Sequence, residues 1–342
     1  MLDVFRKSVS AVGFCAAIGI GTTAYADAVS DFYAGKSIRF HIGAAPGGGY
    51  DLYSRTLAQH MEAKIPGQPK ILIVNMPGSG GVKAANYVYN AAATNGTSLL
   101  MPFWTHPLFQ LIRPRGIKFD MSKMRWVGNM AELNSAVTVL TKVATSWKDA
   151  TKKEIIMASS GKGSETFIYP TLMNSLLGTK FKLVLGYRGA RNMSLAMEKG
   201  EAQGRGGSWQ SWSTIRPKWI ANRTITVLAQ AGLRRLDALP DVPLIHELVK
   251  PADRPVAKLL SAPVTMARIT GFPPGASSVQ IAALRKAFDQ TMVDSGFLAD
   301  AKKRKMDLAP LSGATVQKKI ADLMKTPKPI LKRAAQVLGY TK

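Results

Sequence analysis

Cysteine is nearly absent from this sequence, and the one example in 342 residues is Cys15. It lies in an N-terminal segment with the pattern of a secretory signal: basic residues, an apolar stretch over 11–21 and a small-residue run at 24–26. We predict that cleavage follows Ala26, so that residues 1–26 are a signal peptide and the mature chain reaches the periplasm. The mature chain then has no cysteine, which excludes disulfides, thiolate nucleophiles and cysteine-based metal sites.

Strongly apolar runs are scarce as well. A membrane anchor is the alternative to a cleaved signal, but the uncharged run from Ser8 to Ala26 is rich in alanine, glycine, serine and threonine. A membrane span needs about 20 mostly apolar residues. With 46% hydrophobic and 20% charged residues, the composition is that of a globular protein and indicates neither disorder nor a polytopic membrane protein.

Acidic residues are few: 21 Asp and Glu stand against 46 Lys and Arg, for a formal net charge of +25. Without the signal peptide the count is 44 basic against 20 acidic residues, a net charge of +24. The secretory signal argues against nucleic-acid binding, and no RNP, zinc-finger or arginine-rich motif occurs, so we predict no nucleic-acid partner. The positive field attracts anionic solutes or an anionic membrane surface, unless it is only a solvated surface without a dedicated partner.

Motifs for metal or hydrolytic chemistry are missing. The 4 histidines are scattered, without HExxH or another ligand-like spacing. The Gly-Lys at 161–162 lacks the flanking residues of a P-loop, and the segment around Ser208 lacks the final glycine of a nucleophile elbow. No paired carboxylates stand out for acid–base work. The sequence therefore predicts no metal, no cofactor and no catalytic residue.

Strand-like and helix-like segments alternate along most of the chain, which predicts an α/β fold. The run 37–43 alternates as a partly covered strand does, and the continuous apolar run 71–74 predicts a strand buried on both faces. From Tyr53 to Ile65 an apolar residue recurs every four positions, which predicts a helix. Further strands are expected within 97–103, 136–143, 154–160, 181–187 and 224–230, and further helices within 167–178, 192–200 and from about 279, the last capped by Ser277 or Ser278.

Three turns rich in glycine or serine follow apparent strands, at residues 44–51, 76–83 and 159–166. In an open parallel α/β sheet such turns lie at the carboxyl ends of the strands, where ligands bind. Each turn precedes a helix, whose first N–H groups suit a carboxylate or phosphate, and glycine lets the anion approach the backbone. Any one turn also fits a tight strand-to-helix connection without a ligand, but three in one secreted chain favour an anion-binding cleft.

Aromatic and basic side chains cluster near the same turns and are predicted to wall the cleft. Arg205 is the best placed for a carboxylate, because it lies in a turn among small residues and a guanidinium can make two parallel hydrogen bonds. His106 is the one histidine predicted to face the pocket. The other wall candidates are Trp104, Tyr187, Arg188, Arg191, Trp209 and Trp212, although the last also suits a core or domain interface.

An ordered set of segments resembles the solute-binding receptors of tripartite tricarboxylate transporters, the Bug family. After the signal peptide, the set comprises residues 32–61, 74–90, 159–170, 186–205 and 239–243. The resemblance therefore covers nearly all of the mature chain.

What the resemblance implies is a two-lobed α/β periplasmic binding protein of the type II, Venus-flytrap class, with the ligand cleft between the lobes. It implies that residues 27–132 begin the first lobe, that 133–232 form the second, and that 233–342 return to the first lobe with C-terminal helices. The first-lobe turns resemble loops that hold a carboxylate through main-chain groups and ordered water. The second-lobe turns resemble loops that contribute polar side chains.

Together with the wall residues, these segments define the predicted site. The predicted ligand-binding set is Ala45, Pro46, Gly47, Gly48, Gly49, Tyr50, Asp51, Gly78, Ser79, Gly80, Trp104, His106, Ser160, Ser164, Thr166, Tyr187, Arg188, Arg205 and Ser208. Family members commonly carry threonine or serine where this chain has Tyr50, and bulky aromatics follow Arg205. These departures argue against a simple tricarboxylate and admit an aromatic or amphipathic carboxylate.

The predicted function is that of a monomeric receptor, not an enzyme, which captures a small organic anion by lobe closure and delivers it to membrane permease subunits. Closure requires a ligand that contacts both lobes, since a ligand touching one lobe does not favour the closed state. The alternatives are a sensory receptor that docks on a signalling protein and a periplasmic enzyme on the same scaffold.

Overall fold

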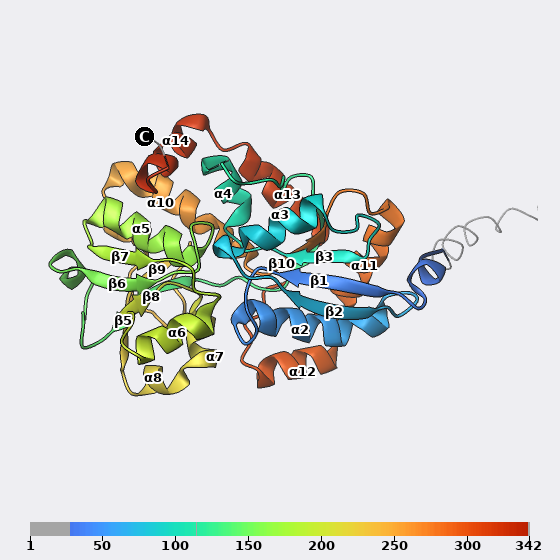
Figure 1. Cartoon of the computed structure of the whole chain (residues 1–342), viewed down its shortest axis with the longest axis horizontal. Helices are drawn as coiled ribbons and strands as arrows, with labels where there is room; N and C mark the ends of the chain where they lie inside the picture. The colour runs from blue at the N-terminus through green and yellow to red at the C-terminus, as the bar shows by residue number, and fades with distance from the viewer. Residues whose placement is uncertain (1–27, 114, 341–342) are drawn as a thin grey trace, which may run out of the picture.

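Two β-sheets, each covered by helices, lie side by side in the computed structural model, which describes residues 28–113 and 115–340 (Figure 1). The predicted signal peptide and its cleavage site lie outside these residues. Within the described ranges, no helix has the length and apolar character that a membrane crossing needs. We call the elements around the six-stranded sheet the first lobe and those around the five-stranded sheet the second lobe.

The first-lobe sheet has the strand order β11-β4-β10-β3-β1-β2. Strands β1, β2 and β3 are parallel, whereas β10 pairs antiparallel with β3 and β4, and β11 antiparallel with β4. The elements are β1 (Ser37–Ile42), α2 (Gly49–Met61), β2 (Lys70–Asn75), α3 (Val82–Asn90), β3 (Ser98–Met101), α4 (His106–Ile112), β4 (Arg125–Asn129), β10 (Ile269–Phe272), α11 (Ser278–Met292), α12 (Ser295–Lys303), β11 (Leu311–Ser312) and α13 (Gly313–Met324).

The second-lobe sheet has the order β7-β6-β8-β5-β9. Strand β6 is parallel to β7 and β8, whereas β5 is antiparallel to β8 and β9. The elements are β5 (Ser135–Leu140), β6 (Ile155–Ala158), α5 (Glu165–Leu177), β7 (Phe181–Val184), α6 (Ala190–Glu198), β8 (Gly204–Arg205), α7 (Trp209–Ile215), α8 (Pro217–Ala221) and β9 (Ile225–Ala231). Both sheets are therefore mixed, and the expectation of a parallel sheet holds only for the strands next to the predicted turns.

Two segments cross between the lobes and pair with each other. The N–H of Met130 donates to the carbonyl of Arg268 at 3.2 Å, that of Ala267 donates to Ala131 at 3.0 Å, and that of Leu133 donates to Val264 at 3.1 Å. The predicted lobe boundaries at 132/133 and 232/233 fall inside the first crossing and just after β9. These paired crossings form the hinge region.

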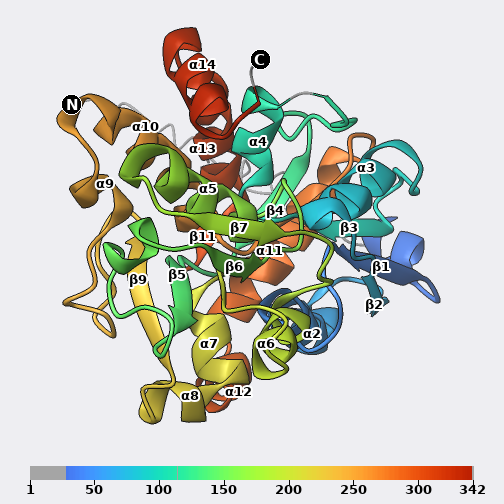
Figure 2. The same cartoon turned by 60° about the vertical axis from the view of Figure 1, so that its left-hand side comes forward.

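The C-terminal part does not pack on the first lobe alone. After β9 come α9 (Ile245–Leu248) and α10 (Arg254–Ser261), and after α13 comes α14 (Lys328–Val337). Helix α14 contacts α4 of the first lobe as well as α5 of the second and α10. Figure 2 shows α14 above α4 and α5, so the end of the described chain lies across both lobes.

The strand predicted to be buried on both faces is at the edge of its sheet, so that prediction is wrong. Strand β2 is the last in the order, and Leu72 is 51% exposed. Side chains alternate between the two faces of a strand, and since Ile71 is buried whereas Leu72 is exposed, only one face of β2 is covered there. The helix after the glycines ends at Met61, with Ile65 buried beyond a short 3-10 turn.

The late helix is confirmed as α11. Its cap is Ser277, whose Oγ accepts from the N–H of Gln280 at 3.2 Å while Gln280 Oε1 accepts from the N–H of Ser277 at 3.0 Å. This capping box satisfies two free donors of the first turn. The predicted apolar face of α11 packs inward, because Leu284 and Phe288 are buried.

Candidate ligand-binding site

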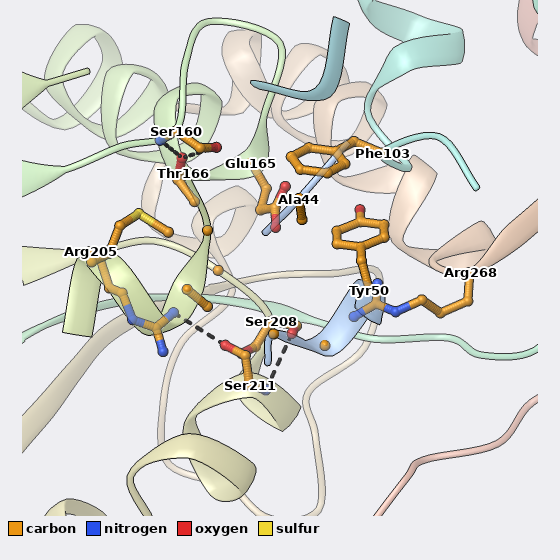
Figure 3. Close-up of a pocket in the computed structure, with 16 residues that line it drawn as sticks. Ala44, Tyr50, Phe103, Ser160, Glu165, Thr166, Arg205, Ser208, Ser211 and Arg268 are labelled. Atoms are coloured by element: carbon orange, nitrogen blue, oxygen red, sulfur yellow. Dashed lines mark hydrogen bonds between the residues drawn. The ribbon is translucent and has the colours of Figure 1, made fainter. Parts of the chain in front are cut away.

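A cavity of about 40 Å³ lies where the two lobes meet, at the carboxyl ends of β1 and β6. Helix α2 and the hinge face it from one side, and α5, β8 and α7 face it from the other (Figure 3). The lining residues are Ala44, Gly48, Gly49, Tyr50, Phe103, Ser160, Glu165, Thr166, Gly189, Ala190, Met193, Arg205, Gly207, Ser208, Ser211 and Arg268. The side chains of two arginines and one glutamate thus border a space that could hold a few water molecules.

Arg268 enters the cavity from the hinge. Its guanidinium lies over the rings of Tyr50, Tyr53 and Trp104, with 4.2, 4.8 and 5.3 Å to the ring centres. The residue is 1% exposed, its Nη1 donates to the carbonyl of Ala267 at 2.7 Å, and its Nε has no partner. Among the described residues no carboxylate oxygen lies within 4.0 Å of it. Aromatic rings thus hold this cation in place of a counter-ion.

Arg205 enters from β8 of the second lobe. It is fully buried, and its guanidinium lies 3.7 Å from the ring centre of Trp212. Its Nε donates to Ser194 Oγ and its Nη1 to Ser211 Oγ, both at 3.1 Å, whereas Nη2 has no partner. Burial lowers the pKa of Arg205 to about 9, so the guanidinium is still charged at neutral pH.

Glu165 is the first residue of α5 and is 6% exposed. Its Oε2 is buried without a hydrogen-bond partner in the described structure. Burial raises the pKa of the Glu165 carboxyl, and the charges of Arg268 and Arg205 oppose that shift. In Figure 3 the carboxyl group lies beside Ala44, between the two arginines.

The first-lobe turn presents glycines to this cation-lined space. A Cβ at Gly49 would lie 2.9 Å from Nη2 of Arg268 and 3.2 Å from Oε1 of Gln210, whereas a Cβ at Gly48 would meet no other heavy atom within 4 Å. Gly49 therefore makes room for a guanidinium of the protein itself. Gly48 leaves the cavity side of the α2 N-terminus open to an anion.

Asp51 braces the same turn and does not line the cavity. Its carboxylate accepts from the N–H of Gly47 at 2.9 Å, from Arg55 Nε at 3.0 Å and from Asn75 Nδ2 at 3.0 Å. Burial raises the pKa of this carboxyl, but the hydrogen bonds outweigh burial and hold the pKa below its ordinary value. Asp51 therefore ties the turn to α2 and β2.

The lobes are in direct contact around the cavity. The N–H of Gly80 donates to the carbonyl of Ser160 at 3.1 Å, and the N–H of Ala45 donates to that of Arg188 at 2.9 Å. The Thr105 hydroxyl donates to the carbonyl of Gly163 at 2.5 Å. Backbone groups from the three predicted turns therefore form the interlobe contact, and this is a closed conformation.

No family model matches the chain. The chain is similar to the UPF0065 protein in the gbd 5′ region of Cupriavidus necator, at 27% identity over 253 residues that cover 71% of this chain and 74% of the relative. It is also similar to the structure of the periplasmic binding protein BugD, with a TM-score of 0.72 and 16% identity over 91% of this chain and 100% of BugD. MatC from Rhodopseudomonas palustris with bound malate has a TM-score of 0.68 and 18% identity, covering 89% of this chain and 99% of MatC.

The resemblance to the Bug family is confirmed. The two mixed sheets with their flanking helices have the two-lobed fold of these periplasmic binding proteins, as predicted. The predicted site residues divide into three groups: those that line the cavity, those that support it and those that lie at its rim.

Seven of the predicted residues line the cavity, namely Gly48, Gly49, Tyr50, Ser160, Thr166, Arg205 and Ser208. Others support the lining from behind. Trp104 and His106 are fully buried, and the Ser164 hydroxyl bonds Thr166 Oγ1 at 2.6 Å and the carbonyl of Gly161 at 2.9 Å. Ala45, Pro46, Gly47, Gly78, Ser79, Gly80, Tyr187 and Arg188 lie in the surrounding turns.

The prediction missed Arg268 and Glu165, the two charged residues that complete the cavity. Arg268 follows the apolar residues 266–267 and precedes β10, so its one signal was a lone arginine in a run of buried residues. Glu165 stands in the first turn of a helix, where an acidic residue commonly needs no ligand to explain it. The sequence therefore gave no reason to assign Glu165 to the ligand site.

His106 gives a testable pH dependence. Its Nε2 donates to the carbonyl of Gly80 at 2.9 Å, its Nδ1 has no partner, and burial lowers the pKa of the ring to about 4. Unfolded histidine titrates near pH 6.5. The unfolded chain therefore binds this proton first, and the stability that the neutral ring contributes is complete above about pH 6.5 and is lost as the pH falls towards 4, by about 3 kcal/mol in all.

We expect His106→Gln to flatten the fall in unfolding free energy between pH 7 and 4.5, measured by urea denaturation. The matched control is His60→Gln on the outer part of α2, near Asp300. Equal slopes for wild type and His106→Gln would contradict the assignment.

Proposed function

We propose that the protein is a periplasmic solute-binding receptor that closes its two lobes on a small organic carboxylate and, as a monomer, delivers it to the permease subunits of a tripartite tricarboxylate-type transporter. It acts by binding and not by catalysis. The similarity to BugD and to malate-bound MatC supports a binding role for the cleft. The glycine turns and the net charge of +25 support an anionic solute.

One observation carries the carboxylate assignment: two buried guanidiniums, Arg205 and Arg268, line the same interlobe cavity without a carboxylate partner among the described residues. A buried charge without a counter-ion is costly. A carboxylate ligand relieves that cost, because guanidinium and carboxylate form paired, charge-assisted hydrogen bonds. Since Arg205 belongs to the second lobe and Arg268 packs on aromatics of the first, such a ligand stabilises the closed state over an open one.

A thermal-shift series tests this proposal. The mature protein is unfolded, freed of small molecules and refolded, then heated with aliphatic and aromatic carboxylates and with the matching primary amides as controls. A ligand that binds only the folded state adds about 2.7 kcal/mol of stability at 100 times its Kd. We expect a saturable rise of the midpoint with at least one acid and none with its amide. Refolded protein that responds to no acid, or equally to acid and amide, would overturn the carboxylate assignment.

A further inference from the structure

Glu165 is the one acidic residue among the described residues that line the cavity. Its Oε2 is enclosed without a hydrogen-bond partner, and Arg205 Nη2 and Arg268 Nε, which also have no partner, do not reach it. Thr166 Oγ1 bonds the hydroxyls of Ser159 and Ser164, and Ser211 Oγ donates to the carbonyl of Ser208 at 2.7 Å. No donor of the described chain reaches this oxygen, so a donor has to come from whatever occupies the cavity.

Burial raises the pKa of the Glu165 carboxyl, and a hydrogen-bond donor on a bound solute would act against that shift by favouring the ionised form. Arg205 and Arg268 both act on it electrostatically, and it stands at the N-terminal end of the 13-residue helix α5. Tyr50 and Tyr169 are the other titratable groups that interact with it, and both stay neutral because burial raises the pKa of each phenol. An ionised carboxylate accepts hydrogen bonds and donates none. The cavity thus combines two cationic donors with one anionic acceptor.

We propose that Glu165 selects, among carboxylate solutes, those that also carry an amino or hydroxyl group, with Oε2 accepting from that group while the arginines hold the carboxylate. The inference rests on the proposed function and names the solute class of the same site. The lining side chains carry two guanidiniums and one carboxylate, a sum of +1, which a hydroxy monocarboxylate or an amino dicarboxylate, each of net charge −1, neutralises. A dicarboxylate without a donor places a second negative charge in the cavity and leaves Oε2 unsatisfied.

Four triads of acids, each differing only in hydrogen, hydroxyl or amino at one carbon, provide the probes. They are propionate, lactate and alanine; succinate, malate and aspartate; glutarate, 2-hydroxyglutarate and glutamate; and phenylacetate, mandelate and phenylglycine. Affinities are measured by calorimetry on refolded mature protein. In the triad that binds, we expect the hydroxy or amino acid to bind roughly tenfold or more tightly than its hydrogen analogue, because a buried charged acceptor left unpaired costs that much.

Two variants assign the preference to Glu165. Glu165→Gln keeps the shape and removes the charge, and should reduce the preference to about threefold or less; Glu165→Met has no acceptor oxygen and should remove it. Both should still bind the hydrogen analogue. Glu201→Gln, exposed on the same lobe, is the matched control and should keep the wild-type preference.

The outcomes separate this inference from the proposed function. Wild-type protein that binds a hydrogen analogue as well as its hydroxy and amino partners overturns the role of Glu165 and leaves the carboxylate receptor intact. A preference that survives in Glu165→Met overturns that role in the same way. Absence of binding in all four triads and in the carboxylate panel counts against the proposed function itself. The wild-type measurement decides even if a variant fails to fold.

Discussion

Arg268→Met is expected to abolish carboxylate binding and to leave the unliganded protein at least as stable as wild type. The guanidinium is 1% exposed, it has no carboxylate partner among the described residues, and its Nε makes no hydrogen bond. Losing one side of a buried charge pair in a complex costs about 2–5 kcal/mol, a reduction of affinity of roughly 30-fold or more. In the free protein the same change removes an unpaired buried charge, and the unbranched methionine side chain still packs on Tyr50 and Tyr53.

Calorimetry with the acid that gives the largest thermal shift tests the binding half of this prediction, and urea denaturation without ligand tests the stability half. Arg216→Met is the matched control, because that guanidinium also lies over an aromatic ring, Trp219 at 5.5 Å, but is outside the cavity. Arg216→Met lowers the net charge by the same amount as Arg268→Met, so both variants lose the same long-range attraction for an anion. Equal losses of affinity in both variants would show that Arg268 acts only through net charge.

The combination of Tyr50 and Arg268 distinguishes this cavity from the main-chain carboxylate site that the family resemblance implies. Tyr50 occupies the turn position where the family resemblance leads us to expect threonine or serine, and its ring stacks on Phe103 at 4.4 Å and on the guanidinium of Arg268 at 4.2 Å. Gly49 beside it leaves room for Nη2 of the same arginine. The aromatic residue in the turn therefore positions a cation and does not simply enlarge an apolar pocket.

The positions of the three glycine- or serine-rich turns could be predicted from the sequence, because glycine and helix-start signals are local. All three turns lie at strand ends: residues of the first and third line the cavity, and the second contacts the third across the lobes. The α11 cap and apolar face could also be predicted. The sequence could not predict which side chains come together at the cavity. Arg268 and Tyr50, for example, meet only because the chain returns from the second lobe. The same return explains the mixed sheet: β10 and β11 are short strands of 4 and 2 residues that enter antiparallel.

The edge position of β2 shows a second limit of pattern reading. An apolar run predicts burial on both faces only if other elements cover both faces of the sheet at that strand, and this packing depends on contacts far along the chain. Ser164 and Asp51 show a third limit, since polar residues in a ligand-facing turn can serve the turn itself. Ser164 bonds Gly161 and Thr166 within its turn, whereas Asp51 bonds Gly47 of its own turn, Arg55 of α2 and Asn75 of β2.

Closure itself depends on a pair of glycines, Gly80 of the first lobe and Gly161 of the second. A Cβ at Gly161 would lie 2.5 Å from the backbone nitrogen of Gly80 and 2.7 Å from the carbonyl carbon of Ser79. Both contacts are with backbone, which cannot rotate away, so the overlap is relieved only if the lobes separate. We therefore expect Gly161→Ala to weaken ligand binding by roughly 10- to 100-fold, the range that corresponds to about 1–3 kcal/mol of overpacking in the closed state.

Gly186→Ala is the control that isolates this effect. Gly186 also has a positive φ, +107° against +142° at Gly161, but a Cβ there would meet nothing within 4 Å. Backbone strain is therefore shared by the two variants, and both should lose a similar amount of stability without ligand. Small-angle scattering with saturating ligand should show compaction for wild type and Gly186→Ala and a more extended particle for Gly161→Ala. Full compaction and wild-type affinity in Gly161→Ala would mean that this turn can yield within the closed state, and that the glycine pair does not control closure.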